Sequence, residues 1–189
     1  MLNRLGWIIM LLVAGCAQET KNAAKYFDFD KLIDDQIILL ANNHRQLKKS
    51  ASLGETPKDT VFRPSAEEWK RELEAFRLLE TINKPAFQNL YHIDDALSDT
   101  KSNLKIRQFS SDKSRVALIK LFYHNDLAQL KKIECVLLQE NFLYASSDQL
   151  TLHFDDIEGR VALTGYTMHG YQKMLLGDTV RFTVQGLIE

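Results

Sequence analysis

The hydrophobic period of this chain changes near its middle, and that change limits the folds open to it. Before residue 104, apolar side chains recur every three or four residues, which is typical of helices that bury one face. From Leu104 onward they alternate with polar side chains, which is typical of half-buried strands. Turn residues separate most of the alternating runs, and links this short join antiparallel neighbours. Helices first and strands afterwards predict an α+β fold.

Two to three helices are expected in the N-terminal half. The first covers residues 27–48. A capping box of Ser65 and Glu68 begins the second, which should end near Asn83 because Pro85 disfavours a helical residue before it. The apolar stripe of this second helix consists of Trp69, Leu73, Phe76, Leu79 and Ile82. A shorter third helix is expected over residues 86–97.

Short strands are expected after the helices. The candidates are 104–109, 115–123, 131–138, 142–146, 149–154, 160–175 and 179–188. Gly165 and Gly170 interrupt the longest of them, and glycine inside a strand marks a bend or bulge. Residues 50–63 are expected to form a loop or a short hairpin. The pattern therefore predicts a curved antiparallel β-meander of six to seven strands packed on a helix.

The N-terminus has the layout of a secretory signal. Arg4 and the free amino group provide positive charge, an apolar run follows, and the small residues Ala14 and Gly15 precede Cys16. The apolar run is about half the roughly 20 residues that a membrane-spanning helix needs. A removable signal is therefore expected rather than a permanent span.

The segment Leu12-Val13-Ala14-Gly15-Cys16 resembles the lipobox of bacterial lipoproteins. The resemblance implies that the Cys16 thiol receives a diacylglycerol, that the chain is cut before Cys16, and that the new amino group is acylated, for example by palmitate. Two or more acyl chains anchor a protein stably in a membrane. The expected organisation is a signal peptide over 1–15, a lipidated flexible tether over 16–25 and a single α+β domain over 26–189. An ordinary signal peptide with an incidental cysteine is the alternative.

The residue after the lipidated position bears on location. In many Gram-negative lipoproteins an Asp there retains the protein in the inner membrane, whereas this chain has Ala17. The resemblance therefore implies an outer-membrane location, with a periplasm-facing domain preferred. The chain is similar in this respect to uncharacterised Gram-negative envelope lipoproteins.

Charge and cysteine content narrow the function classes. The formal net charge is −1, so no strong electrostatic attraction to nucleic acid is expected. With Cys16 lipidated, Cys135 has no partner for an internal disulfide. It lies on the same strand face as Ile133 and Leu137, so a buried structural thiol is expected.

Histidines near aspartates are the weak candidates for a metal site. His92, His124 and His153 each have an Asp within two residues, and His153 shares a strand face with Asp155. A zinc site needs about four converging ligands, whereas aspartates at the ends of elements serve turns. We therefore expect no metal and no cofactor. The sequence also lacks the Gly-x-Ser-x-Gly motif of hydrolases, so no catalytic residue is assigned.

Three functions remain open from the sequence. The first is a non-catalytic binding or assembly module for an envelope protein partner, which predicts an exposed apolar patch or a bare sheet edge. The alternative is a carrier of a hydrophobic ligand, which predicts an apolar cavity of several hundred Å³ in the curved sheet. The second alternative is a metal-assisted hydrolase, which predicts that at least two of the three histidines converge with carboxylates.

Overall fold

The computed structural model describes residues 26–54 and 56–189. The signal segment 1–15 and the whole tether 16–25, with Cys16, therefore lie outside the described residues. The helices are α1 (Phe29–Asn42), α2 (Ala66–Leu73) and α3 (Pro85–Gln88), with the 3-10 helices η1 (Glu74–Asn83) and η2 (Leu127–Gln129). The strands are β1 (Leu47–Leu53), β2 (Pro57–Phe62), β3 (His92–Ser98), β4 (Lys105–Ser110), β5 (Val116–Tyr123), β6 (Leu130–Asn141), β7 (Tyr144–Ile157), β8 (Arg160–Met174) and β9 (Thr179–Ile188).

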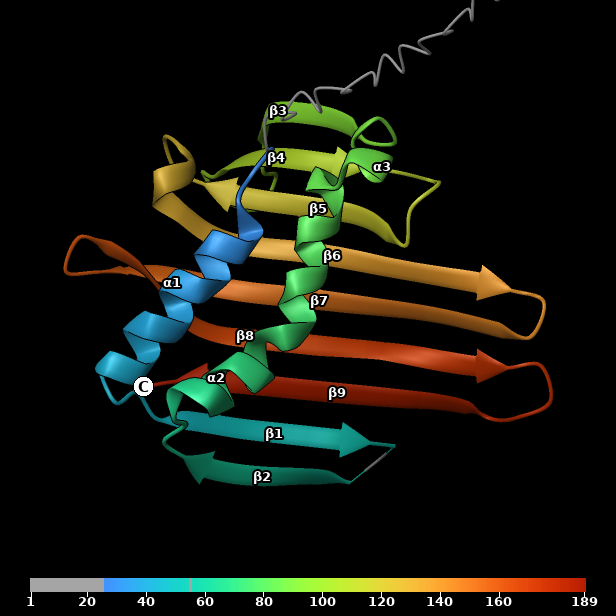
Figure 1. Cartoon of the computed structure of the whole chain (residues 1–189), viewed down its shortest axis with the longest axis horizontal. Coiled ribbons are helices and arrows are strands. Elements are labelled where there is room, and N and C mark those ends of the chain that lie inside the picture. Colours follow the sequence, from blue (N-terminus) through green and yellow to red (C-terminus); the bar gives the residue numbers. More distant parts are fainter. Residues whose placement is uncertain (1–25, 55) are drawn as a thin grey trace, which may run out of the picture.

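The strands form one nine-stranded sheet in the order β2-β1-β9-β8-β7-β6-β5-β4-β3 (Figure 1). Every neighbouring pair is antiparallel. From β3 to β9 the sheet is a meander, as the short turns predict. The C-terminal strand β9 then pairs with β1, which places Leu47 opposite Ile188 and Leu53 opposite Phe182.

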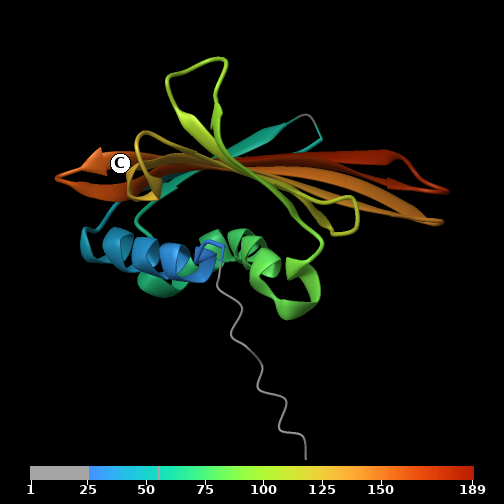
Figure 2. The ribbon, with the colours of Figure 1, turned by 90° about the horizontal axis from the view of Figure 1, so that it is seen from above.

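The helices cover one face of the curved sheet, and the other face carries no helix among the described residues (Figure 2). The core lies between these two layers. Its largest side chains from the helical layer are Phe29, Ile33, Leu40, Trp69, Leu73, Phe76, Leu79 and Ile82. The sheet contributes Leu47, Phe109, Ile119, Leu121, Ile133, Leu152 and Tyr166. The predicted α+β class with a curved antiparallel sheet is confirmed.

The second predicted helix is confirmed at its start and along its stripe. The Glu68 amide donates to the Ser65 hydroxyl at 3.4 Å, and the Ser65 amide donates to the Glu68 carboxylate at 2.8 Å. Both bonds satisfy amides that the first helical turn leaves without partners. All five stripe residues are buried. The path tightens to a 3-10 helix from Glu74 onward.

The first predicted helix is too long, because α1 ends at Asn42 rather than at residue 48. The Asn43 side chain donates to the Leu39 carbonyl at 2.8 Å, and His44 then adopts a positive φ of 49°. A residue in this left-handed region commonly ends a helix, and glycine usually supplies it. Since His44 takes that position here, no glycine in the sequence marks the end of this helix. Leu47 is buried as expected, but as the first residue of β1.

The prediction of six to seven strands is also wrong, because the sheet has nine. Two of the additional strands, β1 and β2, form an antiparallel hairpin, which confirms the hairpin alternative for residues 50–63. The third helix predicted over 86–97 is limited to α3, and β3 follows because it pairs with β4. The two predicted strands 142–146 and 149–154 are one long strand, β7.

The expected irregularity at Gly165 is present. The register of β7 with β8 shifts there, since Phe154 lies opposite Leu163 whereas His153 lies opposite Gly165. Next to this bulge, the α1 side chain of Gln36 completes the hydrogen bonding of β8. It donates to the Val161 carbonyl at 3.1 Å and accepts from the Leu163 amide at 2.7 Å. Gln36 thereby fixes α1 to the part of β8 that extends past β9.

Gly186 on β9 leaves space for the side chain of Tyr166 to extend over β9 on the helix-covered face of the sheet. Tyr166 on β8 lies opposite Gly186 on β9, and a Cβ at Gly186 would be 2.3 Å from the Tyr166 ring. The ring therefore occupies the space above β9 and packs edge-on against Phe76, with 5.9 Å between the ring centroids. No other residue type leaves that space open without displacing the ring.

Replacing Gly186 with Ala should lower the free energy of unfolding by about 1–3 kcal/mol, because the added methyl group overpacks the core. Gly177→Ala is the matched control. Its Cβ would meet nothing nearer than the Met174 Cβ at 3.5 Å, so the expected change is within about 0.5 kcal/mol. Urea unfolding of both variants measures the difference. Equal stabilities of the two would contradict the proposed role of Gly186.

Candidate functional site on the uncovered face of the sheet

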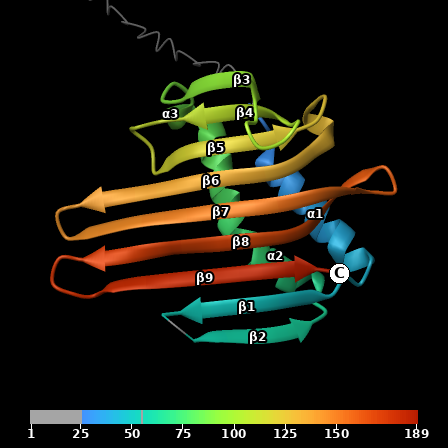
Figure 3. The ribbon, with the colours of Figure 1, turned by 180° about the vertical axis from the view of Figure 1, so that it is seen from behind.

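The face of the sheet without helices is turned toward the viewer in Figure 3, where the helices lie behind the strands. Successive residues of a strand point to opposite faces, so on β1 Lys49 reaches α2 while Lys48 points away from it. The register aligns one row across all nine strands. The row consists of Leu97, Ile106, Phe122, Lys132, His153, Gly165, Leu187, Lys48 and Val61. The turn between β3 and β4 rises from this face and bounds it at one end (Figure 2).

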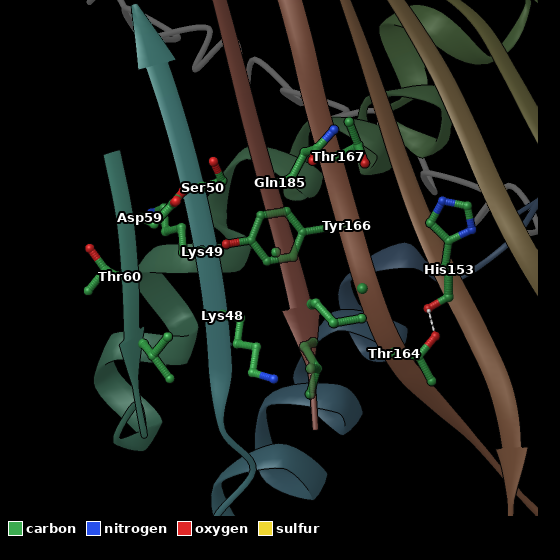
Figure 4. Close-up of a pocket in the computed structure, with 15 residues that line it drawn as sticks. Lys48, Lys49, Ser50, Asp59, Thr60, His153, Thr164, Tyr166, Thr167 and Gln185 are labelled. Carbon is green, nitrogen blue, oxygen red and sulfur yellow. Dashed lines mark hydrogen bonds between the residues drawn. The ribbon is translucent and has the colours of Figure 1, made fainter. Parts of the chain in front are cut away.

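An open groove of about 650 Å³ lies on this row, over β1, β2, β8 and β9. No helix residue lines it. Its side chains on the uncovered face include Lys48, Ser50, Asp59, Val61, His153, Thr167, Gln185 and Leu187. Figure 4 shows Lys48 on β1 and His153 on β7 on either side of β8 and β9. The groove offers a cation, hydroxyls, an amide and apolar carbon within one depression.

Gly165 provides the floor of the groove. It lies in the row between His153 and Leu187, and it has no side chain to fill that place. A Cβ there would be 2.8 Å from the Gly186 carbonyl oxygen, so the close approach of β8 and β9 also requires glycine. Beside the floor, the Thr164 hydroxyl donates to the His153 carbonyl at 3.2 Å (Figure 4).

Charged groups beside the groove are partly neutralised. The Lys48 ammonium group donates to the Glu189 carboxylate at 2.7 Å. The Lys132 ammonium group lies 3.9 Å from the centroid of the Phe122 ring and 2.7 Å from Glu134. Desolvation, and secondly the charge of Lys132, lower the pKa of His153. A neutral imidazole at pH 7 is therefore available as a hydrogen-bond donor and acceptor.

A polar network supports the groove from the covered side. The Tyr166 hydroxyl donates to a Glu72 oxygen at 2.8 Å, and the Lys49 ammonium group bonds both Glu72 oxygens, at 2.9 and 2.7 Å. Burial, and then the bond to Glu72, raise the pKa of Tyr166 well above its usual range. The network connects β1 and β8 to α2. The strands under the groove are therefore held both by pairing within the sheet and by these side-chain bonds to the helix.

The structure does not bring the predicted metal-ligand candidates together. His92 lies at the start of β3 beside Asp94, at 3.2 Å, and His124 follows β5. His153 lies on the uncovered face of β7, and the Asp155 carboxylate accepts from Lys131 at 2.7 Å instead of sharing a cation with His153. Within residues 26–54 and 56–189, no three His, Cys, Asp or Glu side chains are grouped to hold a metal ion.

Cys135 is buried between sheet and helices, as predicted. Burial raises the pKa of its thiol to about 12, so the thiolate is scarce at neutral pH. The groove itself holds no nucleophile with a hydrogen-bonded base among the residues that line it. Its lining residues supply hydrogen-bonding groups and apolar carbon.

The region between the helices and the sheet, where a hydrophobic ligand would have to lie, is filled. Trp69, Phe29, Phe76, Phe109 and Tyr166 are almost fully buried there. A mainly apolar groove of about 540 Å³ lies instead beside α1, at the edge of the layer. It is open to solvent.

Sequence reasoning placed His153 on a strand but missed the groove. Lys48 and Leu187 lie side by side across β1 and β9, although 139 positions separate them in the printed sequence. The one local signal was Gly165, which interrupts an otherwise long alternating strand. It indicated an irregularity, and the structure adds that this irregularity lies under a depression.

Comparison with known proteins gave no relative. No protein-family model, no curated protein and no solved structure matches this chain. In the described part of the chain, no helix has both the length and the apolar character needed to span a bilayer.

The pKa of His153 should lie below 6.5 and should rise when Lys132 is replaced by Gln, because a repelling cation is removed. Since the folded-state pKa is below the unfolded value, His153 leaves stability unchanged at neutral pH and reduces it as pH falls below about 6.5. NMR titration of the imidazole measures the shift, with Lys173→Gln on the same face as the control. A lower pKa in the Lys132 variant would contradict this electrostatic account.

Proposed function

We propose that this chain is a lipid-anchored, non-catalytic binding module of the cell envelope, and that the uncovered face of the sheet receives a protein partner. The observation that carries the proposal is the one-sided construction of the sheet: helices pack on one face, and the other bears the groove around Gly165. A stable protein interface needs roughly 20–30 residues on each side. A nine-stranded face supplies that number.

The sheet edges are less suited to binding than the face. The edge strand β2 begins with Pro57 and carries Lys58 and Asp59, and β3 has a bulge between Asp94 and Leu97. Proline, charges and bulges are the features that keep an edge strand from pairing with another chain. The partner is therefore expected to lie across the strands rather than to extend the sheet.

Mixed chemistry on the face favours a protein partner. Leu187 and Val61 are exposed apolar side chains in the same row as Lys48 and His153. Interfaces between proteins combine apolar contact area with a polar, solvated rim. The described residues provide both within the groove.

The anchoring part of the proposal depends on the sequence around Cys16. The lipobox-like segment ends a short apolar run, and Ala17 replaces the Asp expected of inner-membrane lipoproteins. We infer acylation at Cys16 and a periplasm-facing position at the outer membrane. Two acyl chains would hold the domain at the bilayer without a membrane-spanning helix.

Cys16→Ser should abolish incorporation of labelled palmitate in a Gram-negative bacterium. The physical reason is the loss of the sulfur that carries the diacylglycerol. Cys135→Ser is the matched control, and it should keep the label because its thiol is buried. If the Cys16 variant takes up palmitate as the parent does, the anchor proposal fails.

A photo-crosslinking residue at Gln185 should give a discrete adduct with one envelope protein in the native cell. The same residue at Glu67, exposed on the helical side, should not. Thr167→Trp should abolish the Gln185 adduct, because the indole fills the groove. Adducts from Glu67 alone, or an adduct at Gln185 that persists unchanged with Thr167→Trp, would contradict binding in the groove.

A further inference from the structure

Large apolar side chains are exposed together at one end of the sheet. They lie in the turn between β6 and β7, and at the end of β8 and in the turn that follows it. We call Phe142, Leu143, Met174, Leu175 and Leu176 the apolar tip. All five are exposed, and Phe142 and Leu176 reach 85% and 96% exposure. These are high values for residues whose transfer out of water is favourable.

The two turns form one surface. Tyr144 lies opposite Met174, and the Leu175 amide donates to the Leu143 carbonyl at 3.0 Å. The hairpins β6–β7 and β8–β9 extend past the helical layer and past the ends of β4 and β5 (Figures 1 and 2). The turn at the other end of β7 and β8 contains Glu158 and Gly159 and lacks this apolar character. The tip is therefore a local feature of one end of the sheet.

We propose that the apolar tip inserts into the surface of a lipid bilayer. A projecting tip of five side chains is far smaller than the roughly 20–30 residues per side of a stable protein interface. The tip is narrow and projects beyond the rest of the sheet. A fluid bilayer can accept such a projection without a complementary pocket.

The residues behind the tip suit the membrane interface. Tyr144 and Tyr171 lie on β7 and β8 behind the turns, and tyrosine is enriched at the level of lipid headgroups. The nearby charged side chains are Lys173 and Arg181, and Glu140 and Asp178. Because the two signs balance, insertion depends on apolar contact and needs no anionic lipid.

This contact is independent of acylation at Cys16 and goes beyond the proposed function. An anchored chain with a second contact would have a fixed orientation on the membrane. The experiment therefore uses the full chain carrying Cys16→Ser, in which no acyl group is attached. Since residues 5–13 are apolar and can enter lipid themselves, the readout must report the tip and not total binding.

A bimane label on Leu176→Cys reports the tip directly. Cys135 stays unlabelled, because its side chain is buried and its exposed fraction is 1%. With phosphatidylcholine vesicles, the label at 176 should shift to shorter wavelength and be quenched by a nitroxide near the headgroup. A label on Glu158→Cys, at the opposite end of the strands, should do neither, although the N-terminal segment affects both proteins equally.

Phe142→Ser with Leu175→Ser should raise the lipid concentration for half-maximal quenching at 176 by about tenfold or more. Ile38→Ser with Leu53→Ser is the matched control, since it removes two exposed apolar residues elsewhere, and it should leave quenching unchanged. No quenching at 176, or equal quenching at 158, overturns the proposal. A shift that appears without lipid and grows with protein concentration also overturns it, because the tip would then contact a second copy.

Discussion

The pairing of β9 with both β8 and β1 is the interaction on which the rest of the structure depends. The last strand of the chain joins the N-terminal hairpin to the meander, and two further bonds of 2.9 Å between the backbones of Gln46 and Glu189 extend the ladder. Without this pairing β1 and β2 would be an isolated hairpin, and such hairpins are marginal in water. The groove would then lose one of its walls, because Lys48 and Val61 belong to those strands.

One-sided packing follows from the same pairing. The nine strands form one sheet, and the helical layer packs on one of its faces. Most of the helical residues in the core come from α1 and from the continuous segment α2–η1. The other face is polar apart from scattered apolar residues. One of these, Phe122, is partly covered by the ammonium group of Lys132. Two glycines on neighbouring strands serve the two faces: the missing side chain of Gly186 admits the Tyr166 ring on the covered side, and the missing side chain of Gly165 allows the close approach of the Gly186 carbonyl oxygen. The packing of the core and the shape of the groove are thus determined by the same two strands.

Features encoded by neighbouring residues were predictable from the sequence. The capping box at Ser65, the buried stripe that follows, and the strands ending at Met174 and Ile188 depend on spacing within a few positions. The end of α1 was missed because His44 takes a conformation that glycine usually signals. A hairpin over residues 50–63 was one expected alternative, but its place in the sheet was missed because β1 also pairs with β9 at the other end of the chain. The groove was missed for the same reason. The candidate histidines were chosen from local spacing alone, and spacing could not show whether their side chains converge in the fold.

The contact between Gln36 and β8 limits how the domain can move. A helix packed on a sheet can act as a lid when only apolar contacts hold it, since such contacts slide. Gln36 instead supplies one donor and one acceptor to the backbone of Val161 and Leu163. Lifting α1 would leave both backbone groups without partners in an apolar setting, at a cost of about 1–3 kcal/mol each. The helical layer therefore acts as a rigid backing for the exposed strands, and recognition falls to surfaces that are already formed.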